Sequence, residues 1–372
     1  MDILDEFVFI KNQGGILKKI ILAGGGHGHI NILKNLIRNP IENFEIKLIT
    51  DNEKQYYSGM LAAFMEGIYS EDEISFDVKN LCQKAGVKYI EEKILSIDKE
   101  NNVIKTENNT YNYDFLSINL GSLMNINFPI DSENVILVKP IANIVKSKEI
   151  LNENYKNKEN LNIFLVGGGA SGIELGLALK TSYKKASVNI VTKGEILKNF
   201  NTKAKKKFEK ILTEKNINIY KNEEVLKIRD KQIFTNKTTH EFDFCFVSSG
   251  FRGQDIDFKG FDLFEKNYIK VDERLFAGEN ILAMGDVCTI NKYPQMPKAG
   301  VFAIREAPIL YENLKKMINN ESDFITYKPQ EKYLQIINCG DKYALSNYGK
   351  FASFGKISWL IKDKIDRDYM KI

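Results

Sequence analysis

KKIILAGGGHGH at residues 18–29 and NIFLVGGGASG at residues 162–172 decide the fold. In each stretch an apolar run of strand length leads into a glycine-rich loop and the start of a helix. A second apolar run follows, at residues 44–49 after the first loop and at residues 188–191 after the second. Strand, glycine loop, helix and parallel strand form the βαβ unit that holds a dinucleotide. The sequence therefore predicts an α/β protein with two Rossmann-like domains and two nucleotide cofactors, between which electrons pass.

The second loop has the residue types that a bound pyrophosphate requires. Gly167 permits the tight turn, Gly169 lets the backbone approach the phosphates, and Gly172 lets the helix pack on the strand. Ser171 lies in the same helix start, whose N–H groups and partial positive charge attract the anion. This loop predicts a dinucleotide site.

The first loop matches the same pattern less closely. Gly24 and Gly26 fit the first two glycine positions, but His29 stands at the third. His27 and His29 flank Gly28, and two interpretations of them stay open. They contact a phosphate or flavin, or they only pack at the loop.

Neither loop is followed by the carboxylate that usually binds the ribose hydroxyls of a dinucleotide. After the first loop the expected position is Thr50, with Asp51 beside it, and after the second it is Thr192, followed by Lys193. Lys193 faces the 2′-phosphate of NADPH in one interpretation and is a solvated surface residue in the other. The choice between NADH and NADPH stays open.

The composition indicates a soluble protein of two or three domains, since 372 residues exceed one ordinary core. The acidic start at residues 1–6 lacks the features of a secretory signal, and no apolar run is long enough to span a bilayer, so we expect a cytoplasmic location. A net charge of +4 does not favour nucleic acid. Four scattered cysteines and three histidines predict neither a CxxC redox pair nor a metal site.

Several further motifs give the chain a family resemblance. It resembles the two-dinucleotide flavoproteins of the pyridine nucleotide–disulfide oxidoreductase superfamily, in particular the type II NADH dehydrogenase-like branch. Within that branch it is most similar to the flavoprotein segment fused to selenophosphate synthetase (selenide, water dikinase). The motifs are the two glycine loops, Tyr56 to Leu61, Leu116 to Ser122, Glu174, Met284 to Val287 and Pro297 to Ala303.

The resemblance implies an FAD domain that is divided by an inserted NAD(P)H domain. The FAD domain takes residues 18–145 and 259–325, and the NAD(P)H domain takes residues 146–258. Residues 326–372 form a small C-terminal α+β segment, and residues 1–17 are an extension of unknown role.

The resemblance also implies roles for individual residues. Asp286 binds the ribitol chain of FAD, Lys298 with the helix that follows stabilises reduced flavin, and Glu174 orients the nicotinamide or assists proton transfer. A surface lysine and a solvent-facing glutamate are the alternatives for the last two. The implied cofactor-binding residues are Gly24, Gly26, His27, Gly28, His29, Asp51, Ser58, Gly59, Gly121, Gly167, Gly169, Ser171, Gly172, Lys193, Gly250, Gly285, Asp286 and Ala299.

The C-terminus has the pattern of a basic amphipathic helix. Ile357, Leu360, Ile361, Ile365 and Tyr369 share one face, with a tryptophan nearby. This face either lies on the inner surface of the cell membrane, as in type II NADH dehydrogenases, or is docked on its own domain or at a homodimer interface.

These features predict an FAD-dependent oxidoreductase that takes hydride from NADH or NADPH and passes electrons to a second substrate. A quinone is the favoured acceptor, because redox cysteines adjacent in sequence are absent and the C-terminus is amphipathic. A selenium or sulfur compound is the alternative acceptor. A flavin-based redox sensor is the alternative of another class.

Overall fold

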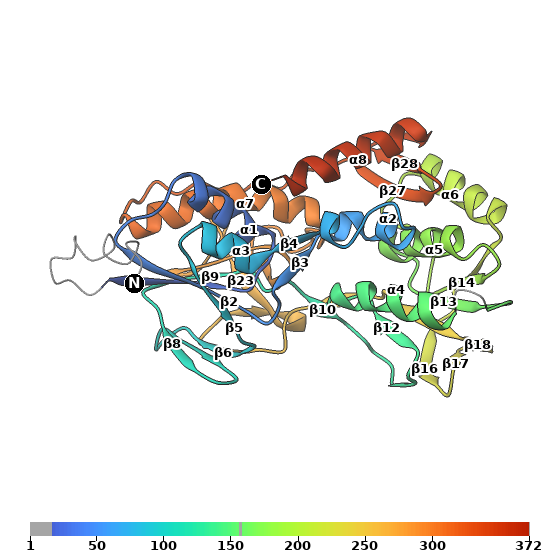
Figure 1. The fold of residues 1–372 in the computed structure, drawn as a ribbon, viewed down its shortest axis with the longest axis horizontal. Coiled ribbons are helices and arrows are strands. Elements are labelled where there is room, and N and C mark those ends of the chain that lie inside the picture. Colours follow the sequence, from blue (N-terminus) through green and yellow to red (C-terminus); the bar gives the residue numbers. More distant parts are fainter. Residues whose placement is uncertain (1–16, 156–157, 372) are drawn as a thin grey trace, which may run out of the picture.

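The computed structural model describes residues 17–155 and 158–371, so the expected N-terminal extension lies outside it except for its last residue. The fold is mixed α/β, with two Rossmann-like sheets side by side and a C-terminal unit across them (Figure 1). The predicted fold class is confirmed.

The first sheet has the strand order β24-β25-β9-β1-β2-β5. β1, β2, β5, β9 and β25 are parallel, and β24 is antiparallel to β25. Nearly all side chains of β1 and β9 are buried, as expected of a parallel sheet with helices on both faces. The elements are β1 (Lys18–Ala23), α1 (His27–Arg38), β2 (Phe44–Thr50), α3 (Val78–Lys84), β5 (Lys88–Glu91), β9 (Phe115–Ile118), β24 (Phe276–Gly278), β25 (Ile281–Ala283) and α7 (Gly300–Ile318).

Smaller elements surround the first sheet. One sheet has the order β21-β6-β7-β8, another β22-β23-β26, and β3 pairs with β4. Their bounds are β3 (Lys54–Tyr56), α2 (Leu61–Met65), β4 (Ser75–Asp77), β6 (Ile94–Asp98), β7 (Val103–Thr106), β8 (Thr110–Asn112), β21 (Asp257–Lys259), β22 (Leu263–Phe264), β23 (Tyr268–Val271) and β26 (Cys288–Ile290).

The second sheet has the order β12-β19-β13-β14-β15 and is parallel throughout. A four-stranded sheet, β11-β16-β17-β18, flanks it. The elements are β11 (Ile130–Asp131), β12 (Val135–Leu137), α4 (Ala142–Asn154), β13 (Asn162–Val166), α5 (Ala170–Ser182), β14 (Ser187–Thr192), α6 (Thr202–Glu214), β15 (Ile217–Lys221), β16 (Val225–Arg229), β17 (Gln232–Thr235), β18 (Thr239–Glu241) and β19 (Phe244–Val247).

The chain crosses between the two halves next to a short antiparallel pair, β10 (Leu123–Met124) and β20 (Phe251–Arg252). β12 already belongs to the second sheet, and β21 pairs with β6 of the first half. Both crossings therefore lie before the boundaries expected at residues 145 and 258.

The C-terminal unit consists of an antiparallel sheet and a helix. The sheet contains β27 (Gln335–Gly340), β28 (Tyr343–Tyr348) and β29 (Phe351–Gly355), and α8 (Lys356–Met370) follows it. Figure 1 shows α8, in red, running from the first half of the molecule to the second. This helix is placed to contact both nucleotide-binding halves.

The amphipathic pattern of α8 is the reverse of the usual one. Ser358, Trp359, Lys362 and Asp366 form its buried face. The aliphatic side chains lie on the other face and are exposed: Ile357 (75%), Leu360 (58%), Ile361 (44%) and Ile365 (48%). Docking on its own chain, expected as one alternative, is thus observed, but through polar side chains. Tyr369 does not share the exposed face as predicted, because its ring packs against His27 and Tyr57.

Candidate active site

Six of the described α-helices begin without a side-chain cap, and the three expected to face cofactors are among them. α3 and α6 are capped by Asp77 and Asn201, which accept hydrogen bonds from backbone N–H groups. α1, α5 and α7 begin after Gly26, Gly169 and Ala299, which provide no side-chain cap of their own, although in α1 the Gly28 N–H donates to Asn119 Oδ1. Uncapped N–H groups at a helix N-terminus are available to an anionic ligand.

The first glycine loop is shaped by Asn119, which follows β9. Asn119 accepts hydrogen bonds from Gly26 N–H through its carbonyl (3.2 Å) and from Gly28 N–H through Oδ1 (2.8 Å). A Cβ on Gly26 would lie 2.3 Å from that Oδ1, so this position requires glycine for packing alone. The sequence motif contained Asn119, but its role became visible only in the fold.

The two histidines of this loop have different surroundings. His29 is fully buried, with Nδ1 2.5 Å from Gly24 O and Nε2 2.8 Å from Ser117 Oγ. Both of its ring nitrogens are thus engaged within the protein, which corresponds to the packing interpretation. His27 is partly exposed and contacts Tyr369 Oη through Nδ1 (2.6 Å). Burial lowers the pKa of both imidazoles to about 4, so both are neutral at pH 7.

The second loop leaves open space where a pyrophosphate would lie. A Cβ on Gly172 would lie 2.2 Å from Gly167 O, and one on Gly167 would lie 2.8 Å from Ser248 O. A Cβ on Gly169 would meet no atom of the described residues within 4 Å. Gly167 and Gly172 therefore serve the turn and its packing, whereas Gly169 faces room for a ligand. This geometry fits a dinucleotide.

Asp286 is held by two groups that are distant in sequence. Lys139 Nζ donates to Asp286 Oδ2 (2.6 Å) and to Ser122 Oγ (2.7 Å). Burial raises the pKa of the Asp286 carboxyl, but Lys139 and then Lys298 outweigh burial and lower it. The hydrogen bonds to this carboxyl from the described residues all end on Oδ2, which leaves Oδ1 available to accept from a ligand hydroxyl. That arrangement fits a polyol such as ribitol. Lys139 was missed because no local pattern marks it.

Lys298 and Ala299 lie at the start of α7. Lys298 Nζ donates to Cys288 O and to Thr289 Oγ1 (3.0 Å), so the lysine is directed at β26 and is not a free surface residue. A Cβ on Gly300 would lie 4.0 Å from Ser58 Oγ. The N-terminus of α7 therefore meets the Ser58–Gly59 turn, and the fold brings together two segments that the sequence placed at one site.

Glu174 faces a buried charge cluster at the junction of the two halves. It accepts a hydrogen bond from Asn338 N–H (2.8 Å). Burial raises the pKa of Glu174, and the positive charge of Lys362 partly offsets that effect. Lys362 Nζ donates to Gly59 O and to Asp366 Oδ2 (2.6 Å). The alternative of a plain solvent-facing glutamate is wrong for this residue.

The other expected site residues have the following placements. Asp51 and Ser171 are exposed, and Lys193 is paired with Glu224 at 2.7 Å. Gly121, Gly250 and Gly285 have positive φ values of 72°, 68° and 75°, which favour glycine.

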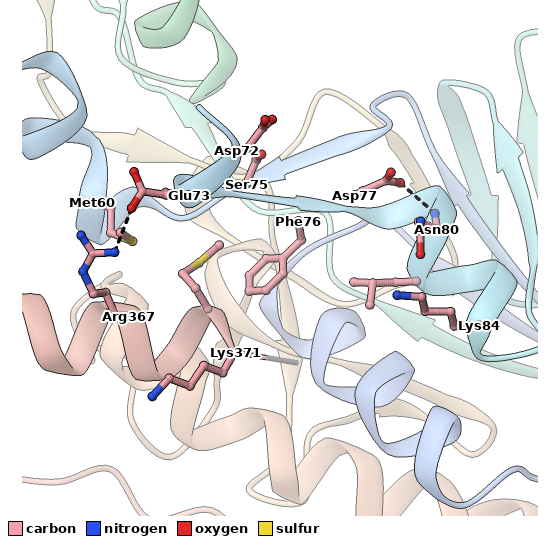
Figure 2. Close-up of a pocket in the computed structure, with 12 residues that line it drawn as sticks. Met60, Asp72, Glu73, Ser75, Phe76, Asp77, Asn80, Lys84, Arg367 and Lys371 are labelled. Carbon is pink, nitrogen blue, oxygen red and sulfur yellow. Dashed lines mark hydrogen bonds and ion pairs between the residues drawn. The ribbon is translucent and has the colours of Figure 1, made fainter. Parts of the chain in front are cut away.

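A pocket of about 560 Å³ opens beside the Ser58–Met60 turn. Figure 2 shows Phe76 at its floor and Arg367 of α8 paired with Glu73 at one end, where Nη1 and Oε1 are 2.8 Å apart. Met60, Phe76, Leu81 and Met370 make an apolar floor, and charged side chains form the rim. An apolar floor with a polar rim suits a flat organic molecule.

The four cysteines, Cys82, Cys245, Cys288 and Cys339, are all buried free thiols. Burial raises the pKa of each thiol, which disfavours the reactive thiolate. Within residues 17–155 and 158–371 there is also no group of side chains that could hold a metal ion.

Buried Glu306 on α7 makes stability depend on pH. Glu306 Oε2 accepts from Gly285 N–H (2.8 Å), and burial raises the pKa of the carboxyl to about 7. Because this pKa is above its value in the unfolded chain, the folded protein favours the protonated carboxyl. The stabilisation from protonated Glu306 is therefore complete below about pH 4.5 and is lost as the pH rises through about 7. We expect Glu306→Gln, which keeps an acceptor for Gly285 and cannot ionise, to raise the free energy of unfolding by about 2 kcal/mol at pH 8 and to change it little at pH 5.

Urea unfolding at both pH values, with FAD in excess, measures this difference. If Glu306→Gln changed the free energy of unfolding by the same amount at pH 5 and at pH 8, Glu306 would not be the group that makes stability depend on pH.

Known proteins share this architecture. The type II NADH:quinone oxidoreductase of Staphylococcus aureus is 25% identical over 174 residues, which are 42% of either chain. The match thus spans less than half the length of the curated relatives. The sulfide:quinone oxidoreductase of Aquifex aeolicus superposes with a TM-score of 0.77 at 22% identity, covering 94% of this chain and 90% of that one. NDH2 of Plasmodium falciparum in complex with NADH superposes with a TM-score of 0.79 at 17% identity. The superposition covers 95% of this chain and 97% of that one. These two structures show a common fold.

The family pattern described as pyridine nucleotide-disulphide oxidoreductase matches residues 18–307. This range contains both glycine loops, Glu174, Asp286 and the N-terminus of α7. It leaves out the C-terminal unit, which supplies Lys362. The chain therefore belongs to the pyridine nucleotide-disulphide oxidoreductase family, whose enzymes use FAD together with NADH or NADPH.

Proposed function

We propose that this FAD-dependent NAD(P)H oxidoreductase reduces a quinone at a membrane surface. The observation that carries the proposal is the arrangement of α8. One face of the helix brings Lys362 and Asp366 to the junction of the two nucleotide-binding halves, and the other leaves four aliphatic side chains exposed. A single helix thus connects the candidate active site with a surface suited to lipid, where quinones reside.

Each half of the molecule has a separate task in this reaction. FAD, when bound, accepts a hydride equivalent and passes the electrons on. The loop at Gly169 and the start of α5 bind the NAD(P)H pyrophosphate, and the loop at Gly26 with Asp286 binds FAD. The overall reaction consumes NAD(P)H, quinone and one proton and yields NAD(P)⁺ and quinol.

The cluster of Glu174, Lys362 and Asp366 is suited to supply that proton. Lys362 holds a proton on Nζ between Gly59 O and Asp366. Its pKa is raised, because Glu174 and Asp366 outweigh the opposing effect of burial, so the lysine keeps its charge. Burial raises the pKa of the Glu174 carboxyl, which makes Glu174 the proposed proton donor of the cluster. Reduction of a quinone at the Ser58–Met60 turn draws a proton from this cluster, and solvent restores it. The apolar-floored pocket beside Met60 is the proposed entrance for the quinone ring.

The exposed face of α8 is the proposed membrane contact. Phe351, at the start of the preceding strand β29, is also 79% exposed. Lys350, Lys356 and Lys364 accompany this face in the sequence, and each basic residue near an anionic lipid surface adds about 1 kcal/mol of attraction. Among the described residues no helix is both long and apolar enough to cross a bilayer. Attachment would therefore be peripheral, on the inner face of the membrane.

The buried thiols argue against a sulfur-based acceptor. Sulfide and polysulfide chemistry on this fold would need a reactive thiolate, and burial keeps the pKa of all four thiols raised. The sequence motifs that resemble those of flavoproteins fused to selenophosphate synthetase nevertheless make a selenium compound the second acceptor to compare.

Anaerobic mixing of the purified FAD-loaded protein with NADH and NADPH, followed by an acceptor, tests the proposal. We expect rapid bleaching of the flavin absorbance and rapid reoxidation by a short-chain quinone. Polysulfide and selenite are the comparison acceptors. Reoxidation by one of these and by no quinone would overturn the quinone assignment. Slow bleaching that ends in a stable charge-transfer complex would instead indicate a redox sensor.

A further inference from the structure

The strand end that receives the adenosine ribose has no carboxylate for it. β14 ends at Thr192, whose Oγ1 would lie 2.8 Å from a Cβ on Gly168. The segment that follows is tied to the same loop, because Leu197 N–H donates to Gly168 O (2.8 Å). A dinucleotide on this loop extends its adenosine ribose to this strand end. Threonine therefore stands where a carboxylate would bind both ribose hydroxyls of NADH.

Two of the neighbouring carboxylates are already engaged. Glu195 pairs with Lys221, and their charged atoms are 2.9 Å apart. Glu223 is 4% exposed and accepts hydrogen bonds from Thr235 Oγ1 (2.7 Å) and from His240 Nε2 (2.6 Å). Releasing Glu223 to a ribose would leave buried polar groups without partners, which costs more than one hydrogen bond returns. Glu223 is therefore not available to replace the missing carboxylate, and Glu195 is directed at Lys221 of β15.

Lys193, by contrast, is free to change partner. It pairs with Glu224 at 2.7 Å, and the two side chains are 76% and 46% exposed. An exposed ion pair of this kind contributes at most about 1 kcal/mol. A phosphate dianion carries more negative charge than the single carboxylate of Glu224 and therefore attracts the ammonium group more strongly. A 2′-phosphate at this strand end would therefore draw Lys193 away from Glu224.

We propose that NADPH, rather than NADH, is the electron donor of this enzyme, and that Lys193 binds its 2′-phosphate. Glu224 holds the lysine near the strand end in the free protein and opposes the phosphate by its negative charge. Lys198 adds positive charge at the same turn, since its Cε would lie 3.3 Å from a Cβ on Gly194. This inference rests on the proposed function for the role of the nicotinamide, and it names the donor.

Calorimetric titration with two adenosine nucleotides tests the site without turnover. Adenosine 2′,5′-bisphosphate and adenosine 5′-monophosphate differ only in the 2′-phosphate. We expect the FAD-loaded protein to bind the bisphosphate at least about tenfold more tightly, and Lys193→Ala to remove most of that preference. Glu224→Gln should strengthen bisphosphate binding a few-fold, because it removes the competing charge.

A matched control is available on α6. Lys210 is 75% exposed and pairs with Glu214 at 3.6 Å. Lys210→Ala should leave both dissociation constants within about twofold of the parent values. In flavin reduction assays, Lys193→Ala should lower kcat/KM for NADPH by about tenfold or more and change the value for NADH much less.

Two results would overturn the inference. One is that the parent protein binds the bisphosphate and the monophosphate with equal affinity, and the other is that Lys193→Ala lowers the affinity for both nucleotides by the same factor. Failure of the proposed function has a different signature, because the flavin would then be reduced by neither NADH nor NADPH while the calorimetric preference persists.

Discussion

Replacing Gly169 by valine should leave the protein yellow and slow the reduction of its flavin by NADH and NADPH by about 100-fold or more. The valine Cβ would meet no atom of the described residues within 4 Å, so the fold has room for it. Gly169 has a φ of −76°, which any residue can adopt. That space is where a pyrophosphate would approach the uncapped N-terminus of α5. The substitution therefore acts on the ligand and not on the protein.

Stopped-flow bleaching of the flavin absorbance measures the effect, and the FAD content per chain provides the first control. Gly26→Ala is the contrasting variant, because its Cβ would lie 2.3 Å from Asn119 Oδ1. It should disturb the first loop and lower FAD content. If Gly169→Val lost its flavin and Gly26→Ala kept it, the two loops would be assigned the wrong way round.

The two glycine loops could be predicted because their signal is local. Strand, turn and helix start lie within about a dozen residues, and the glycines of such a loop are required by close steric contacts in that short segment or with the ligand. Even so, the sequence did not show which glycines are required for packing within the protein and which leave room for a ligand. Gly26 and Gly172 are needed for contacts within the protein, whereas Gly169 faces open space. That distinction depends on Asn119 and Ser248, whose positions only the folded chain sets.

The charged partners of the predicted site residues could not be predicted, because they come from distant segments. Lys139 reaches Asp286, and Lys362 reaches Gly59 from the far end of the chain. Periodicity identified α8 as amphipathic, but it did not show which face would dock. Lys362 and Asp366 dock because the fold offers them a carbonyl and each other as partners. A pattern of hydrophobic residues cannot identify a polar helix face that is buried because its side chains find hydrogen-bond partners.

Serine substitutions on the exposed face of α8 should abolish binding to membranes. We expect the parent protein to sediment with vesicles that contain anionic lipid, more weakly as salt rises. The variant with Ile357→Ser, Leu360→Ser, Ile361→Ser and Ile365→Ser should lower the vesicle partition coefficient by about 100-fold or more, since each side chain contributes on the order of 1 kcal/mol on insertion. Reduction of a water-soluble quinone should be unchanged, because these four side chains point away from Lys362 and Asp366.

Exposed leucines elsewhere supply the matched control for this prediction. Leu95, Leu226 and Leu334 are 43%, 53% and 42% exposed, and none of them lies on α8. Serine at these three positions removes exposed apolar side chains elsewhere on the molecule and should leave vesicle binding intact. If both sets of substitutions weakened binding equally, attachment would not depend on α8. If the parent protein instead failed to bind vesicles and was a dimer in sedimentation velocity, while the α8 variant was a monomer, the aliphatic face would be a contact between two copies of this chain. The requirement for a lipid-borne quinone would then lose its structural support.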